Sequence, residues 1–130
     1  METIQFGVHY LIDGYNGNKE SLASTESVTE FLAEIPDLLA MHTLCDPVVK
    51  LVGPKNKKDS GGVSGFVMIA ESHISIHTFP NRKFATIDVY TCQDSVDTEI
   101  IKNCIEKYFN FDSCDEQLIP RGTRYPAKDY

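Results

Sequence analysis

The fold is decided by residues 63–91, which read VSGFVMIAESHISIHTFPNRKFATIDVYT. Three apolar runs follow one another closely in this stretch, at Val63–Ala70, Ile74–Thr78 and Phe84–Thr91. Their β-branched and aromatic residues favour strands, and Pro80 with Asn81 gives a turn signal between the last two runs. Strands joined by such short connections usually pair antiparallel. The stretch therefore predicts the centre of an antiparallel sheet.

Strand patterns also occur on either side of this centre. Apolar residues alternate from Ile4 to Ile12, which predicts an opening strand followed by a loop over residues 13–18. Val48–Val52 is a second β-branched run, and the polar, Lys- and Gly-rich residues 53–62 after it predict an exposed, mobile loop. A final short strand is indicated only weakly, near Gln117–Ile119.

Two segments change to helical spacing. The first runs from a possible capping box at Ser27 and Glu30 to Leu39, and Pro36 inside it predicts a kink or a break. The second places one apolar face along residues 100–109. Both helices need an apolar surface to cover. We therefore expect an α+β fold, a two-layer sandwich of one antiparallel sheet with two helices on one face.

Length and composition limit the classes of function that the chain could have. The 130 residues are 42% apolar and 24% charged, which is typical of one globular domain spanning residues 1–130. Nineteen acidic against 12 basic residues give a net charge of −7, the wrong sign for binding nucleic acid or an anionic membrane. The four cysteines have no metal-site spacing, and neither a membrane span nor a secretory signal is visible. We expect a cytoplasmic protein with free thiols.

The densest polar chemistry lies in residues 71–80. A shared metal ion on His73 and His77 is not expected, because four positions along a strand put the two imidazoles about 13 Å apart. A serine hydrolase is not expected either, because Ser64 lacks the second glycine of the G-x-S-x-G motif. From the pattern alone, these residues are best interpreted as the polar face of a half-solvated strand.

Residues 71–80, with Gly62–Gly65 before them and Ile87–Cys92 after them, closely resemble the prokaryotic S-adenosylmethionine decarboxylase proenzymes. These are small pyruvoyl-dependent enzymes of polyamine (spermidine) biosynthesis. The resemblance is specific across residues 61–92, and it is poor from residue 105 onward.

The resemblance implies that the chain cuts itself between Glu71 and Ser72. The Ser72 hydroxyl would attack the carbonyl of Glu71 and convert the amide to an ester, and elimination would then part the chain. A β chain of residues 1–71 and an α chain of residues 72–130 would result. Ser72 would become a pyruvoyl group, a cofactor that forms a Schiff base with the substrate amine and accepts electrons when carbon dioxide leaves.

The resemblance also assigns three supporting residues. His77 matches the family's histidine for proton transfer during processing, and Ser64 matches a serine assigned to the same site. Cys92 matches the proton donor of the decarboxylation, although a buried core thiol is the ordinary role of a free cysteine. The family forms dimers with the sheets of two protomers side by side, so a homodimer of processed units is expected. No metal is implied.

The substrate stays open between three amino-acid-type molecules. Family members place an aromatic ring against adenine from the strand before Gly62–Gly65, but Val48–Val52 contains none; Phe6, Tyr10 or Phe66 are candidates to replace it. Relatives of the family decarboxylate arginine or ornithine, which have no adenine, and Arg82 is a candidate to hold a carboxylate. A non-catalytic, uncut relative is the alternative from another class.

Strand parity gives one further expectation. In a regular strand, Ser72 and His77 would point to opposite faces. The resemblance therefore predicts a bend near residues 71–73.

Overall fold

The computed structural model describes all 130 residues. In chain order the elements are β1 (Thr3–Ile4), β2 (Gly7–Tyr15), α1 (Lys19–Leu22), α2 (Thr25–Leu38), β3 (Val48–Val52), β4 (Gly62–Ile69), β5 (Ser72–Phe79), a short 3-10 helix (Pro80–Arg82), β6 (Phe84–Thr91), α3 (Thr98–Phe109), β7 (Ser113–Arg121) and β8 (Tyr125–Pro126).

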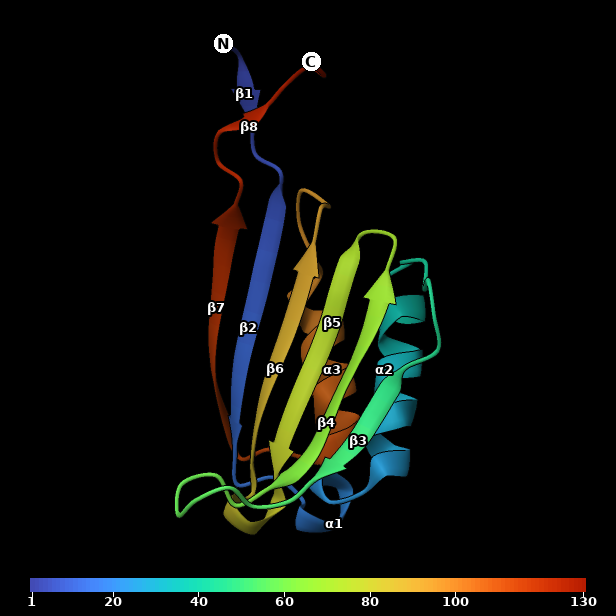
Figure 1. The fold of residues 1–130 in the computed structure, drawn as a ribbon, viewed down its shortest axis with the longest axis vertical. Coiled ribbons are helices and arrows are strands. Elements are labelled where there is room, and N and C mark those ends of the chain that lie inside the picture. The colour runs from blue at the N-terminus through green and yellow to red at the C-terminus, as the bar shows by residue number, and fades with distance from the viewer.

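Six strands form one sheet in the order β3-β4-β5-β6-β2-β7, and each neighbouring pair is antiparallel (Figure 1). The three strands predicted for residues 63–91 are its adjacent central members. A separate two-stranded ladder pairs β1 with β8 near the chain ends. The prediction of an antiparallel sheet is confirmed.

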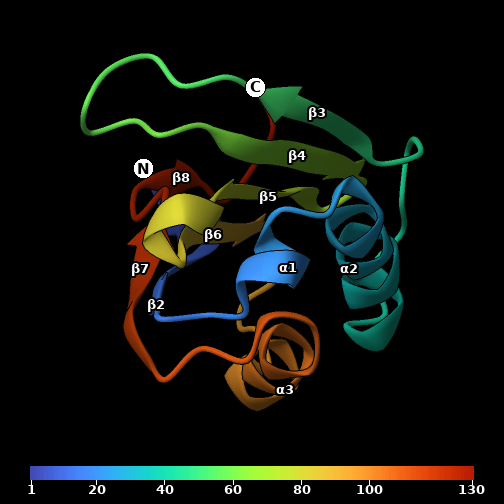
Figure 2. The ribbon, with the colours of Figure 1, turned by 90° about the horizontal axis from the view of Figure 1, so that it is seen from below.

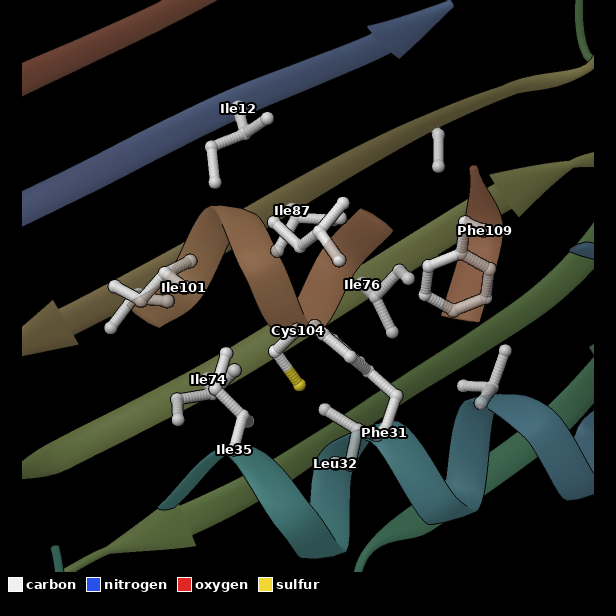
Figure 3. Packing of buried hydrophobic residues seen from close by; sticks show 14 of the residues in the cluster. Ile12, Phe31, Leu32, Ile35, Ile74, Ile76, Ile87, Ile101, Cys104 and Phe109 are labelled. Atoms are coloured by element: carbon white, nitrogen blue, oxygen red, sulfur yellow. The ribbon is translucent and has the colours of Figure 1, made fainter. Parts of the chain in front are cut away.

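All three α-helices lie on one face of the sheet, which leaves the other face uncovered (Figure 2). The strands supply the covered face with every second residue, as buried side chains alternate with more exposed ones along β2, β4, β5 and β6. Isoleucines from these strands pack against Phe31, Leu32 and Ile35 of α2 and against Ile101 and Phe109 of α3 (Figure 3). The two-layer α+β sandwich is therefore confirmed, with α1 as a helix that the pattern did not predict.

Helix α2 differs from its prediction at both ends. Ser24, not Ser27, is the N-cap, and its hydroxyl accepts the backbone N–H of Ser27. The predicted break at Pro36 is wrong, because α2 continues to Leu38. A proline in the last turn removes one hydrogen bond where the helix is already ending, so it costs little continuity.

Strand β7 is much longer than the predicted Gln117–Ile119. It pairs with β2 over nine positions, from Gly7 opposite Arg121 to Tyr15 opposite Ser113. All nine residues of β7 are exposed, and β7 is an edge strand of the sheet. The apolar alternation that predicts a strand arises from burial, so it is missing from the polar sequence of β7, and the full length of this strand was not predicted.

No helix in the structure combines the length and the apolar character needed to cross a membrane.

Candidate active site

The Glu71–Ser72 peptide bond lies at a tight hairpin. Ala70 and Glu71 form a two-residue turn between β4 and β5, and Ile69 lies opposite Ser72. The end of β6 and the start of β2 reach the same end of the sheet (Figure 1). The hairpin therefore places this bond next to residues from two further strands.

The backbone at Ser72 is strained. Two-residue hairpin turns normally place positive φ angles on the turn residues, yet Ala70 and Glu71 are not among the residues with positive φ, whereas Ser72 has φ +147°. That region is populated almost only by glycine and costs a serine on the order of 1–3 kcal/mol. The irregular backbone expected near residues 71–73 is thus found at Ser72, directly after the peptide bond in question.

The carbonyl oxygen of Glu71 accepts a hydrogen bond from the backbone N–H of Cys92, at 2.8 Å. Cys92 follows the last residue of β6, Thr91, which lies opposite Ser72. Gly7 permits this approach, because a β-carbon there would lie 2.1 Å from the Thr91 carbonyl oxygen and 2.8 Å from the Cys92 Cα. A donor aimed at this oxygen would stabilise the negative charge that forms when a nucleophile attacks the carbonyl.

The carboxylate of Glu71 is held by His42. One oxygen accepts the backbone N–H of His42 at 3.0 Å, and the other lies 2.9 Å from its imidazole Nδ1. These two hydrogen bonds, the side-chain one first, keep the pKa of Glu71 below its usual value. Sequence reasoning did not find His42, because nothing in the pattern links it to a residue 29 positions away.

Ser64 and His77 form a pair, as the family resemblance suggests. They are opposite one another on β4 and β5, and the Ser64 hydroxyl lies 2.8 Å from His77 Nδ1. His77 is, however, five residues from Ser72 along β5, which corresponds to about 16 Å. The structure therefore joins Ser72 with Cys92, and Ser64 with His77, but it does not bring these two pairs together within one chain.

A polar cluster that the sequence did not indicate lies on the uncovered face. His9 Nε2 is 2.9 Å from a carboxylate oxygen of Asp88, and Arg121 donates to His9 Nδ1 at 3.1 Å. Since arginine can only donate, Nδ1 must accept, and the His9 proton sits on Nε2 facing Asp88. The Arg121 guanidinium also lies 4.8 Å from the ring centre of Tyr90.

The three candidate aromatic rings differ in whether they are accessible to a ligand. Tyr10 is buried in the core and donates to Glu116, so it is not available to stack on a ligand. Phe66 is exposed on β4. Phe6 packs against Tyr125 with ring centres 5.1 Å apart, and it precedes Gly7, whose backbone lies against that of Cys92.

Arg82 contacts the loop between β3 and β4. Its guanidinium donates to the carbonyl of Lys57 at 2.6 Å and so braces the exposed loop between β3 and β4. Residues 80–82 form a short 3-10 helix followed by Lys83 in the left-handed conformation, which agrees with the predicted turn.

Comparison with known proteins agrees with this fold. The family model described as S-adenosylmethionine decarboxylase matches residues 8–122. The S-adenosylmethionine decarboxylase proenzyme of Pyrococcus furiosus is 33% identical over 122 residues, covering 94% of this chain and 81% of that protein. A crystal structure of the adenosylmethionine decarboxylase from Aquifex aeolicus superimposes with a TM-score of 0.80 at 28% identity, covering 98% of this chain and 99% of that one.

The match is strongest over a shorter stretch. The proenzyme of Bacillus cytotoxicus is 45% identical over 62 residues, so the matched part spans about half of each chain, 48% in both cases. The single antiparallel sheet covered by helices on one face and these likenesses define a class of small two-layer α+β proteins. The chain belongs to the S-adenosylmethionine decarboxylase family.

Proposed function

We propose that this chain is a self-processing, pyruvoyl-dependent decarboxylase of polyamine biosynthesis that acts on S-adenosylmethionine. The observation that carries the proposal is the Glu71–Ser72 bond: its carbonyl accepts the Cys92 N–H, and the residue after it has φ +147°. Family membership supports the same reading. The whole chain, residues 1–130, acts as one domain that is cut into residues 1–71 and 72–130.

Processing begins when the Ser72 oxygen attacks the Glu71 carbonyl carbon. The new C–O bond replaces the C–N bond, the hydroxyl proton moves to the freed nitrogen, and an ester results. Loss of the Ser72 α-proton then expels Glu71 as a carboxylate and leaves a 2-aminoacryloyl end. Water converts this end to a pyruvoyl group and releases ammonia. Strain at Ser72 favours the steps that break this backbone.

The residues present fit such a group. Ser72 supplies its atoms, and Cys92 provides both the backbone donor at Glu71 and an exposed thiol. The pyruvoyl carbonyl supplies an electron sink for the pair released when carbon dioxide leaves. Cys92 donates the proton that then quenches the substrate carbon, which is the role we assign to its thiol.

We assign the proton transfers of processing to His77, supported by Ser64, and this assignment requires two chains. His77 lies about 16 Å along β5 from the Ser72 of its own chain. A homodimer formed through the uncovered sheet face would let His77 of the partner subunit serve the cleavage. That face exposes apolar side chains, including Phe66, Met68 and Ile119 at 38–47% of their areas, which association would bury.

Arginine or ornithine is the second candidate substrate class, favoured by one observation. Strand β3 has no aromatic residue, and the burial of Tyr10 removes one possible substitute. The names of the relatives favour S-adenosylmethionine, and Phe6 and Phe66 are still available to stack on adenine.

For location we propose the cytoplasm, on the ground that all four cysteines are free.

Carbon dioxide release from carboxyl-labelled S-adenosylmethionine, arginine and ornithine, measured in parallel on cleaved protein, tests the substrate. We expect release from S-adenosylmethionine. Release from arginine or ornithine alone would move the assignment to the second class, and release from none would support a non-catalytic relative.

A further inference from the structure

The segment after α2 contacts the hairpin that would be cut. Thr43 forms an isolated antiparallel bridge with Ile69, the last residue of β4. On either side of it, Leu44 donates its N–H to the Met68 carbonyl at 2.9 Å, and Ala70 donates to the His42 carbonyl at 2.7 Å. This short ladder therefore fixes residue 42 beside the Ala70–Glu71 turn.

From that position His42 grips the Glu71 side chain at two points. Its backbone N–H and its imidazole Nδ1 each take one carboxylate oxygen, at 3.0 and 2.9 Å. The Glu71 side chain is only 16% exposed, whereas that of His42 is 79% exposed. A carboxylate fixed through both oxygens has little freedom to rotate, because the two donors define its plane as well as its position.

Glu71 is thus held from two sides. His42 holds the side chain, and the Cys92 N–H holds the carbonyl oxygen. An unfavourable φ angle persists only where its surroundings hold it in place. Because the side chain and the carbonyl of Glu71 are both held, the irregular backbone geometry of the turn occurs at Ser72.

We propose that His42 is a positioning residue for self-cleavage: by gripping the Glu71 carboxylate it holds the Glu71 carbonyl in place for attack by Ser72. This inference rests on the proposed cleavage between Glu71 and Ser72. It assigns His42 no contact with the reacting atoms. His42 acts only through Glu71, so the effect of replacing His42 on cleavage must disappear when the Glu71 carboxylate is removed.

The test measures cleavage rates of chains made by cell-free translation and followed on denaturing gels. His42→Ala should slow cleavage about five- to tenfold, the effect of one lost hydrogen bond made by an exposed side chain. His42→Asn, whose side-chain amide can donate to the same oxygen, should bring the rate back to within about twofold of the wild type. Adding His42→Ala to Glu71→Ala should cause no further slowing.

Thr43→Ala is the matched control, since Thr43 is also exposed and its side chain makes no hydrogen bond in the structure. It should cleave at the wild-type rate. If His42→Ala fails to fold, Glu71→Ala removes the same contact from the other partner and must itself slow cleavage.

Wild-type rates in His42→Ala, equal slowing in Thr43→Ala, or a further loss in the double variant would overturn the inference while leaving the proposed function intact. A wild-type chain that never cleaves would overturn both.

Discussion

The backbone N–H of Cys92 donates to the carbonyl oxygen of Glu71 at 2.8 Å, so one residue brings both a peptide donor and a thiol to the proposed cleavage site. The two groups have separate assignments. In the proposed mechanism the peptide N–H acts on the chain's own carbonyl, and the thiol acts later on the substrate.

Cys92→Ala separates these roles. It keeps the N–H, so cleavage should proceed at the wild-type rate, while decarboxylation should fall by about 100-fold or more through loss of the general acid. Gel analysis gives the first rate and carbon dioxide release the second. Cys45→Ala, which changes another exposed free thiol, is the control. Undiminished turnover in Cys92→Ala would show that another group donates the proton.

Gly7→Ala tests the peptide donor. A methyl group at residue 7 would lie 2.1 Å from the Thr91 carbonyl oxygen, so β2 or the start of the Thr91–Cys92 segment must shift. Cleavage should slow about tenfold or more as the Cys92 N–H moves off its acceptor. Gly53→Ala is the matched control, because its added methyl group meets nothing within 4 Å. Equal cleavage rates in both variants would count against the role of the Cys92 N–H.

Mixed dimers test the contribution of a second chain. Ser72→Ala cannot be cut but keeps His77, whereas His77→Ala keeps Ser72 but lacks the histidine. Alone, neither should cleave at the normal rate. Co-expressed with distinguishable tags, the pair should yield fragments of the His77→Ala chain only. Absence of this complementation, with mixed dimers present by native mass spectrometry, would mean that His77 does not act across the interface.

The pH dependence of stability tests the Glu71 contact. Its pKa lies below the usual 4.5, and a carboxylate with a lowered folded-state pKa stabilises the fold above its unfolded pKa and loses that effect as pH falls through the folded value. In an uncut Ser72→Ala background, the Tm advantage of Glu71 over Glu71→Gln should be steady above about pH 5 and shrink towards about pH 3. A constant difference over this range would contradict the ionised contact.

Much of the fold could be predicted because a strand with one buried face alternates apolar and polar residues in its sequence. The alternation in β5 and β6 follows their position at the centre of the sheet, where one face packs on helices. Strand β7 was underestimated because all of its side chains are exposed, so burial imposes no apolar alternation on its sequence. Propensity likewise could not foresee that α2 continues through Pro36.

The site divides in the same way. A motif predicts roles for Ser72, Cys92, Ser64 and His77, and the structure shows Ser64 and His77 as a pair on adjacent strands. His42 could not be foreseen, because its link to Glu71 exists only after the segment following α2 pairs with the hairpin. The His9–Asp88–Arg121 cluster draws on three different strands and leaves no local pattern either.

The intact mass of freshly purified protein tests the central claim most directly. The wild-type chain should give two masses, those of residues 1–71 and of residues 72–130 with a pyruvoyl end, and Ser72→Ala should give one mass for all 130 residues. A wild-type chain that stays whole, or a Ser72→Ala chain that is cut at the same bond, would contradict the account.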